Sequence, residues 1–213
     1  MINDIEAGPT SIWNEGKGFE TIGSEQAPFS GSLDGQNFAI YSLRIHRNDQ
    51  EFVGLFGLIR SGKIKNVQLE NISIEGGDRT GGIAGKLSLG SITESSVTGT
   101  ISGDTHVGGI AGFNRGTIKR AESRAVISGR SYVGGITGIN RGFILRSFAA
   151  AQVQGLHHNV GGLVGNNYAG SITESEAQGW VIAEKASSVG GLSGSNGGRI
   201  LRSFSSAQVR GKG

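Results

Sequence analysis

The sequence contains no cysteine, which excludes disulfide bonds, thiolate metal sites and cysteine nucleophiles. It has only 2 prolines against 39 glycines, which fits neither the strict period of collagen nor a proline-rich disordered linker. No apolar run is long enough to span a bilayer, and the N-terminus lacks the basic and apolar segments of a signal peptide. We therefore expect the export signal of a secreted parent to lie outside this sequence.

The chain also has little excess of positive over negative charge. Lys and Arg number 20 and Asp and Glu 17, which gives a formal net charge of +3 at pH 7. So small an excess in a chain of 213 residues is weak ground for nucleic-acid binding. We expect no nucleic-acid partner and no insertion into a membrane.

What the sequence does have is a short glycine-rich block that recurs six times. Four copies have the form V-G-G-[IL]-x-G, one reads T-G-G-I-A-G, and the earliest is the divergent V-G-L-F-G. The copies begin, at steps of 27, 27, 26, 27 and 29, with Val53, Thr80, Val107, Val133, Val160 and Val189. A fixed period of this size indicates stacked repeats, because a unit so small cannot bury its apolar face alone.

Two further apolar positions follow the block in each repeat. One is an isoleucine, found at Ile64, Ile92, Ile118, Ile144, Ile172 and Ile200. The other trails the later isoleucines by eight or nine residues, and we place it at Ile101, Val126, Val153, Val181 and Val209. Three short apolar segments between turn residues predict three strands per repeat, and no helical periodicity competes with them. The sequence therefore predicts an all-β fold, a right-handed parallel β-solenoid (β-helix) with three-strand coils of about 27 residues.

The paired glycines of the block have a structural interpretation. The clearest pairs are Gly108, Gly109, Gly134, Gly135, Gly161, Gly162, Gly190 and Gly191. We expect them to allow positive φ at a corner and close approach of stacked backbones. An asparagine follows each of the last four blocks, at Asn114, Asn140, Asn167 and Asn196. Stacked asparagines predict an amide ladder along a turn in which left-handed backbone is tolerated.

Residues 1–52 are richer in aromatics than the repeats. They contain Trp13, Phe19, Phe29, Phe38, Tyr41 and Phe52. Terminal repeats of a solenoid are atypical, so we interpret residues 1–52 as N-terminal capping coils, continuous with the six repeats of residues 53–213 in one domain. A carbohydrate-stacking surface is the alternative reading of these aromatics.

Catalytic motifs are missing from the chain. There is no H-E-x-x-H metallopeptidase signature and no G-x-S-x-G elbow of a serine hydrolase. Residues 81–86 superficially resemble a phosphate-binding loop, but Thr80 stands where its first glycine is required and Leu87 where its hydroxyl is required. Some parallel β-helices are polysaccharide lyases, but such an enzyme needs convergent carboxylates or bases displaced from the repeat register, and we find none. We expect a protein that is not an enzyme and that holds no metal or cofactor.

The repeat block resembles the GLUG motif of large bacterial exoproteins. The preceding region is similar to the segment that usually precedes GLUG repeats, with W-N at 13–14, G-F-E-T-I-G at 18–23 and F-S-G-S-L-D-G at 29–35. The family includes filamentous-haemagglutinin-like adhesins and the non-catalytic N-terminal regions of IgA-specific metallopeptidases. The resemblance implies a secreted or bacterial cell-surface stalk or binding scaffold, with no active-site residues to transfer.

The expected partners are host cell-surface glycans or proteins and further repeats of the same parent chain. Two residues after each isoleucine, the register places a mixed-charge ladder of Asn66, Glu94, Arg120, Arg146, Glu174 and Arg202. With the nearby turn residues Arg115 and Arg141, the central Arg120 and Arg146 are predicted to form a basic patch. Such a patch either keeps the scaffold soluble or contacts anionic glycans.

Overall fold

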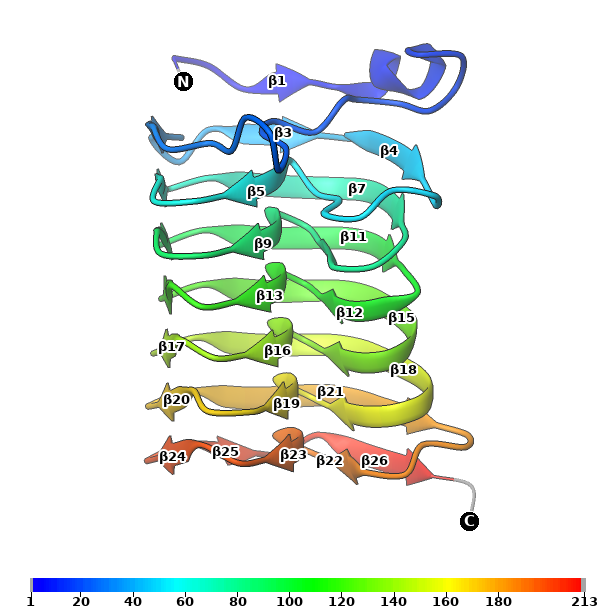
Figure 1. Ribbon diagram of the computed structural model, residues 1–213, viewed down its shortest axis with the longest axis vertical. Coiled ribbons are helices and arrows are strands. Elements are labelled where there is room, and N and C mark those ends of the chain that lie inside the picture. Colours follow the sequence, from blue (N-terminus) through cyan, green and yellow to red (C-terminus); the bar gives the residue numbers. More distant parts are fainter. Residues whose placement is uncertain (1, 212–213) are drawn as a thin grey trace.

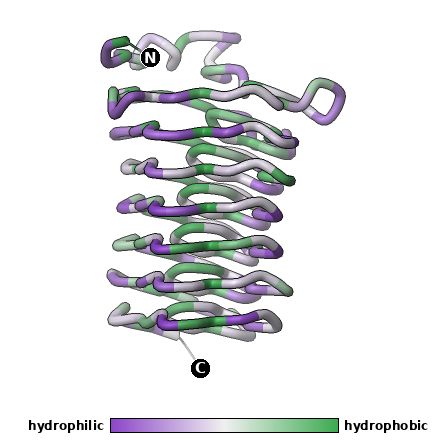
Figure 2. Tube along the Cα trace, turned by 90° about the vertical axis from the view of Figure 1, so that its left-hand side faces the viewer, coloured by the Kyte–Doolittle hydropathy of each residue, from purple (hydrophilic) through white to green (hydrophobic). Residues whose placement is uncertain are grey.

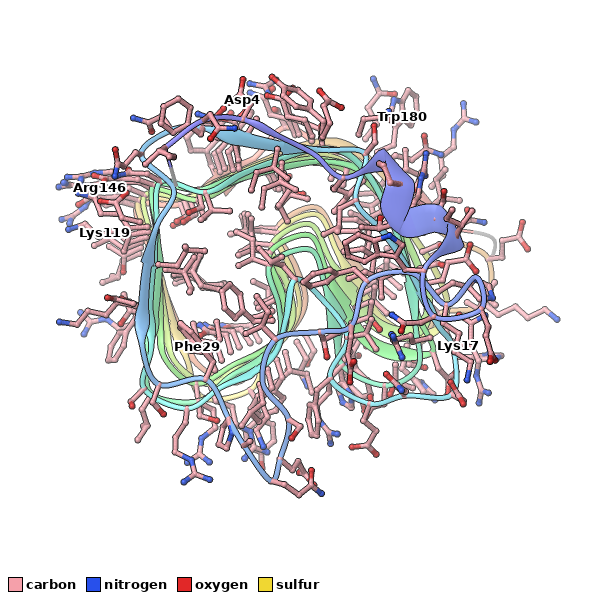
Figure 3. The ribbon with its side chains drawn as sticks, turned by 90° about the horizontal axis from the view of Figure 1, so that it is seen from above. Asp4, Lys17, Phe29, Lys119, Arg146 and Trp180 are labelled. Atoms are coloured by element: carbon pink, nitrogen blue, oxygen red, sulfur yellow. The ribbon has the colours of Figure 1, made fainter. Side chains whose placement is uncertain are left out.

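The computed structural model describes residues 2–211, which form a β-solenoid of stacked coils (Figure 1). The chain runs clockwise when viewed from its N-terminal end and recedes from the viewer, so the coils are right-handed (Figure 3). Every pairing between named strands is parallel, and paired residues of successive repeats are 26 to 29 positions apart. The predicted fold class is confirmed. Residues 1, 212 and 213, at the outer limits of the two predicted regions, lie outside the described residues.

Three parallel sheets form the walls of the solenoid. The described part of the largest follows the order β1 (Ile5–Glu6), β3 (Ala39–Tyr41), β7 (Gln68–Gly76), β11 (Ser96–Ser102), β15 (Glu122–Gly134), β18 (Phe148–Gly161), β21 (Glu176–Ala183) and β25 (Phe204–Ser205). Five shorter strands belong to the same sheet. β4 (Arg44–Arg47) and β26 (Gln208–Gly211) pair with the second halves of β7 and β21 in the same wall. β8 (Thr80–Gly81), β12 (Thr105–Gly108) and β22 (Val189–Gly190) extend the sheet around a corner, in register with the ends of β15 and β18.

The other two walls consist of shorter strands. One contains β2 (Ser32–Asp34), β6 (Lys63–Lys65), β10 (Ser91–Thr93), β14 (Thr117–Lys119), β17 (Phe143–Leu145), β20 (Ser171–Thr173) and β24 (Arg199–Leu201). The other contains β5 (Phe56–Ile59), β9 (Ala84–Leu87), β13 (Ala111–Asn114), β16 (Thr137–Asn140), β19 (Val164–Asn167) and β23 (Ser193–Asn196). The hydropathy of the chain repeats from coil to coil as stripes along the rod (Figure 2).

The core is a set of stacked apolar ladders, as the repeat predicts. The isoleucines of the second block are in register from Ile64 to Ile200, and those between Ile64 and Ile172 are at most 1% exposed. The block valines from Val107 to Val189 are also stacked. Stacked apolar side chains at parallel-strand spacing exclude water from the centre of the internal coils.

One residue of the predicted third ladder is wrong. Ile101 and Val153 pair with Ile127, which is fully buried, whereas Val126 is 46% exposed on the outer face. From Ile92 onward the ladder position lies nine residues after the isoleucine, so the alternative spacing of eight selects a residue on the opposite face. A shift of one residue in a strand reverses the direction of its side chain.

The paired glycines permit close backbone approach but do not adopt positive φ. None of the eight is among the described glycines with positive φ. A Cβ on Gly135 would lie 2.2 Å from the carbonyl oxygen of Gly162 in the next coil. Left-handed backbone occurs instead at residues that precede the block, such as His106 (φ 57°) and Tyr132 (φ 56°), and along the charged ladder. The expected reason for these glycines is therefore half right.

The asparagine ladder is present inside the corner between the two shorter walls. Asn114 donates from Nδ2 to Oδ1 of Asn140 at 2.8 Å, Asn140 donates to Asn167 at 2.9 Å, and Asn167 donates to Asn196 at 2.7 Å. Asn114, Asn140 and Asn167 are fully buried, and none of the four has positive φ. Oδ1 of Asn140 also accepts the N–H of Gly142 at 3.2 Å, and Oδ1 of Asn114 accepts the N–H of Gly116 at 3.0 Å, so these two amides close their own turns while they bond to their neighbours.

The N-terminal region continues the same walls. Ile5 of β1 pairs with Ile40, and Leu33 of β2 pairs with Ile64. A 3-10 helix, η1 (Gly8–Ile12), interrupts this part of the coil. Phe29 packs its ring on Phe56 at a centroid distance of 4.7 Å. These contacts extend the core of the repeats toward the N-terminal end of the rod.

A buried serine interrupts one of the apolar ladders. Ser123 stacks on Val97 and Ala149, and its Oγ is the one buried side-chain polar atom of the described residues without a hydrogen-bond partner. We expect Ser123→Ala to leave the free energy of unfolding unchanged or to raise it by up to about 1 kcal/mol, because the hydroxyl is desolvated without compensation. Ser147 is the matched control: its Oγ donates to Leu145 and accepts from the N–H of Ala121, so Ser147→Ala should destabilise. Urea unfolding measures both, and a loss in Ser123→Ala as large as that in Ser147→Ala would contradict the assignment.

Candidate binding surface

The four arginines predicted to form a basic patch lie at two corners of the coil. Arg120 and Arg146 directly follow β14 and β17, whereas Arg115 and Arg141 precede the same strands. Five residues of extended chain separate the two corners of a coil, a distance of roughly 16 Å. The structure thus separates the expected patch into two pairs.

The corner of Arg120 and Arg146 carries the predicted mixed-charge ladder. Arg120 contacts Glu94 at 2.7 Å, and Arg146 contacts Glu174 at 2.6 Å. Glu174 also bonds Arg202 in the following coil at 2.6 Å. These hydrogen bonds, from Arg146 and then Arg202, lower the pKa of the Glu174 carboxyl below its ordinary value. We call this row, Asn66, Glu94, Arg120, Arg146, Glu174 and Arg202, the corner ladder; each of its three arginines pairs with one of its two glutamates.

The other corner combines arginine with aromatic rings. The guanidinium of Arg141 lies over the ring of Tyr168 at 4.4 Å and near that of Phe113 at 5.8 Å. Tyr168 is 56% exposed, and Phe143, two residues beyond Arg141, is 62% exposed on β17. We call Phe113, Arg115, Arg141, Phe143 and Tyr168 the arginine–aromatic corner. Arginine stacked on an aromatic face is held in a fixed plane with its donors still available at the edge.

Charge pairing distinguishes the two corners. Within residues 2–211, no carboxylate lies within ion-pair distance of Arg115 or Arg141. A carboxylate or sulfate can accept two hydrogen bonds from one guanidinium, and an exposed ring offers a flat apolar surface to a sugar. The arginine–aromatic corner is therefore the better equipped of the two for an anionic saccharide.

The aromatic members of this corner were missed from the sequence. Arg115, Arg141 and Tyr168 each directly follow a ladder asparagine, so counting from the asparagines places all three at the same turn position. Phe143 precedes its ladder isoleucine by one residue and therefore faces outward. The repeat register therefore predicts that these aromatic side chains lie beside the arginines, but considering only the charged residues overlooks them.

Asp78 is the centre of a hydrogen-bonded group elsewhere on the rod. Asp78 Oδ1 contacts both Nδ1 of His106 and Oγ1 of Thr105, and His106 stacks on Tyr132 with ring centroids 5.1 Å apart. Burial opposes ionisation of Asp78, but hydrogen bonds from His106 and Thr105 outweigh it and lower the pKa of the carboxyl. Across the described chain, no group of three or more His, Cys, Asp or Glu side chains is placed to hold a metal ion. None of the helices in the described part has the length and hydropathy needed to cross a membrane.

Comparisons with known proteins give matches to parts of the chain. The sequence is 43% identical over 115 residues to halomucin of Haloquadratum walsbyi, a match that covers 51% of this chain and 1% of halomucin. It is 36% identical over 64 residues to a protein of Evansella cellulosilytica named as a Gly-rich membrane protein, covering 29% of this chain and 7% of that relative. No solved structure gives a significant match.

The family model that matches is the GLUG motif, over residues 157–182. This segment contains the block that begins at Val160 and spans one coil of the solenoid, from the end of β18 to β21. The motif predicted from the block is therefore present in the repeat region of this chain.

Proposed function

We propose that the chain is a non-catalytic repeat scaffold of a secreted or cell-surface protein, and that it acts as an adhesin. The observation that carries the proposal is the combination of a regular solenoid with an outward-facing arginine–aromatic corner. The names of the relatives, a halomucin and a membrane protein, support a place at the cell surface. A rod of this kind holds its surface side chains at fixed rung spacing, which suits a long polymeric ligand.

The ligand class we propose is an anionic glycan, such as a sulfated polysaccharide of a host surface. Arg115 and Arg141 would donate hydrogen bonds to sulfate or carboxylate groups, and Phe143 and Tyr168 would pack against sugar rings. Because the guanidinium groups belong to successive coils, their spacing is close to that of one rung, about 4.8 Å. Arg120 and Arg146 contribute less in this proposal, since they are already paired with Glu94 and Glu174.

The glycan proposal is tested by comparing two double variants. Arg115→Ser with Arg141→Ser should weaken binding to immobilised heparin at least about tenfold, a loss of about 1.4 kcal/mol. Arg120→Ser with Arg146→Ser removes the same formal charge and should weaken binding less than about threefold, because ion pairs with Glu94 and Glu174 already occupy those arginines. Surface plasmon resonance at two salt concentrations measures both, and wild-type binding should fall as salt screens the charges.

Equal losses in the two double variants would show that net charge alone drives binding. Full affinity in Arg115→Ser with Arg141→Ser would reject this corner and leave the N-terminal aromatic surface as the candidate. Uncharged dextran serves as the ligand control. Retained glycan should be released unaltered, and cleavage of the bound chains would reject the non-catalytic assignment.

A further inference from the structure

A groove of about 360 Å³ lies on the outer face of the largest sheet, where β4 pairs with β7. Its floor consists of four outward-facing residues of these two strands, Arg44, His46, Ser73 and Glu75. Ile45 and Ile74, which alternate with them, are 1% exposed and face the core. The groove therefore opens sideways from the wall and belongs to neither end face of the rod.

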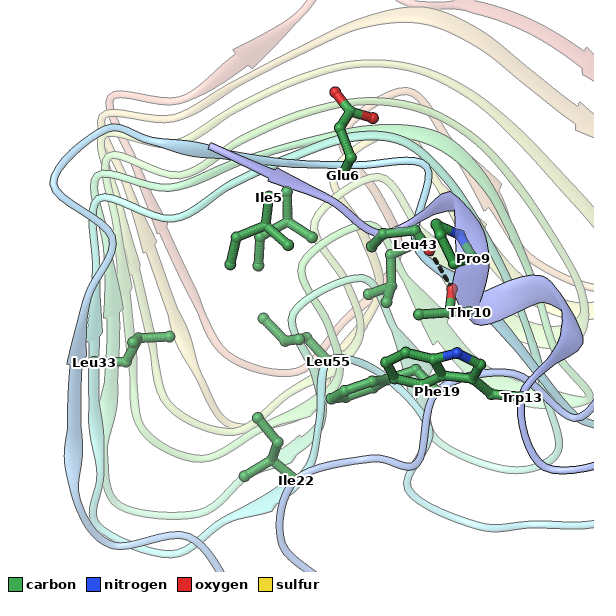
Figure 4. Close-up of a pocket in the computed structure, with 12 residues that line it drawn as sticks. Ile5, Glu6, Pro9, Thr10, Trp13, Phe19, Ile22, Leu33, Leu43 and Leu55 are labelled. Carbon is green, nitrogen blue, oxygen red and sulfur yellow. Dashed lines mark hydrogen bonds between the residues drawn. The ribbon is translucent and has the colours of Figure 1, made fainter. Parts of the chain in front are cut away.

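The segment that forms the rim of the groove is fixed to β4. Thr10 of η1 donates from Oγ1 to the carbonyl oxygen of Ala7, the dashed line in Figure 4, and the same Oγ1 accepts the N–H of Arg44 at 3.0 Å. The apolar residues of this segment line a cavity inside the coil, whereas Ser11 lines the groove outside. Gly18, which also lines the groove, forms a bridge to β4. Rim and floor are thus joined by hydrogen bonds, so the groove is formed before any ligand binds.

Arg44 is the unsatisfied residue of this groove. It is half-buried, yet across residues 2–211 its guanidinium has no carboxylate within ion-pair distance and no hydrogen-bond acceptor. The register explains why: His46 lies opposite Glu75 and contacts it at 2.9 Å. Arg44 lies opposite Ser73, whose hydroxyl carries no charge. A partly desolvated guanidinium without an anion favours the binding of one, and a carboxylate matches its planar donors best.

The other residues of the groove favour a ligand that also has hydroxyl groups. Within the described chain, the hydroxyls of Ser11 and Ser73 form no hydrogen bonds, so each can donate or accept one. The carboxylate of Glu75 repels a second anion but accepts hydroxyl donors. A sugar acid combines one carboxylate with several hydroxyls on a single ring. The volume of the groove lies near the lower end of the range for ligand pockets, as expected for one sugar residue.

We infer that this groove binds a hexuronic acid residue of an acidic polysaccharide. Arg44 donates two parallel hydrogen bonds to the ligand carboxylate, as guanidinium groups commonly do. The ring hydroxyls of the ligand bond Ser11, Ser73 and Glu75. This inference rests on the proposed saccharide-binding function, but it adds a second, carboxylate-specific site on a different wall from the arginine–aromatic corner.

The test compares two probes, methyl β-D-glucuronide and methyl β-D-glucoside, which differ only in a carboxylate against a hydroxymethyl group. Nuclear magnetic resonance titration of the isotope-labelled chain measures the Kd of each probe and identifies the amide signals that shift. The glucuronide should bind at least about tenfold more tightly, because only it forms charge-assisted bonds with Arg44. It should shift the backbone amides of Ser11, Arg44 and Ser73. Equal affinity for the two probes, or shifts confined to other parts of the chain, would overturn the inference.

Substitutions of Arg44 separate recognition from net charge. Arg44→Gln should weaken glucuronide binding at least about tenfold, and Arg44→Lys should recover only part of the loss, because lysine keeps the charge but lacks the planar fork. Arg60→Gln, at an exposed position that follows β5, removes the same charge and should bind like the wild type. The thermal midpoint of Arg44→Gln should be unchanged, since the native side chain has no partner to lose. Equal binding by Arg44→Gln and Arg60→Gln would overturn the inference.

The double variant Arg115→Ser with Arg141→Ser distinguishes this site from the arginine–aromatic corner. It should bind methyl β-D-glucuronide with the wild-type Kd, because neither arginine lines the groove. Loss of glucuronide binding in this double variant would assign the sugar acid to the corner and overturn the inference. Wild-type heparin binding by the same variant would reject the corner but would leave the groove and its glucuronide affinity in place.

Discussion

Replacing Ile144 with aspartate is expected to cost at least about 4 kcal/mol of the free energy of unfolding. Ile144 is 1% exposed and is stacked between Ile118 and Ile172 in the ladder of β17. A carboxylate at this position would be desolvated with no polar group of the ladder beside it. At roughly 2 to 4 °C per kcal/mol for a chain of this size, the midpoint of thermal unfolding should fall by about 8 to 16 °C or more.

The matched control lies on the same strand. Phe143→Asp introduces the same carboxylate on the outer face, where Phe143 is 62% exposed, and should change the midpoint by only a few degrees. Circular dichroism during heating measures both variants. An Ile144→Asp variant that unfolds at the wild-type temperature would show that this ladder does not form the core.

The core could be predicted from the sequence because a solenoid converts sequence period directly into spatial neighbours. Isoleucines about 27 residues apart can only be stacked if each repeat makes one coil, so the period alone predicts the contact between Ile64 and Ile92. Val126 shows the limit of this reasoning. The period locates a segment, but the face of the strand is decided by single-residue alternation, and two adjacent apolar residues leave that choice open.

The candidate binding surface was less predictable. The register gave the charge ladder with its members in order, and the structure contains the ion pairs that such a ladder implies. The register did not predict that Arg115 and Arg120 lie at different corners of the coil, because the positions of the corners depend on how the three sheets meet. Backbone conformation was also hard to predict. The left-handed residues include Arg120, Arg146 and their counterparts, residue types that seldom suggest positive φ from sequence.

The repetition also explains why the two ends differ from the middle. Each internal coil is covered by two neighbours, and its ladder residues are nearly inaccessible, whereas Val189, Leu192 and Ile200 have a coil on one side only. The 3-10 helix and the aromatic residues at the other end cover the first coil only in part, since Trp13 is still 48% exposed.

Gly134→Ala is expected to destabilise the fold by at least about 3 kcal/mol, although the change adds one methyl group. A Cβ on Gly134 would lie 2.3 Å from the carbonyl oxygen of Thr137 and 2.6 Å from the backbone nitrogen of Gly165 in the next coil. Both atoms belong to backbone that is fixed by parallel strand pairing, so neither can move without the loss of hydrogen bonds in two coils. The φ of Gly134 is not positive, so this loss measures the close approach of stacked coils and not backbone strain.

Gly8→Ala provides the control for the general effect of replacing glycine. The nearest atom to its added Cβ is Cβ of Ser42 at 3.9 Å, and its φ is not positive. This variant should be neutral or gain up to about 1 kcal/mol, because alanine reduces the entropy of the unfolded chain. Urea unfolding of the two variants isolates the steric term, since the unfolded-state gain is common to both. If Gly134→Ala were as stable as Gly8→Ala, the coils would be more loosely stacked than their hydrogen-bond register requires, and the regular spacing of the block along this chain would need another cause.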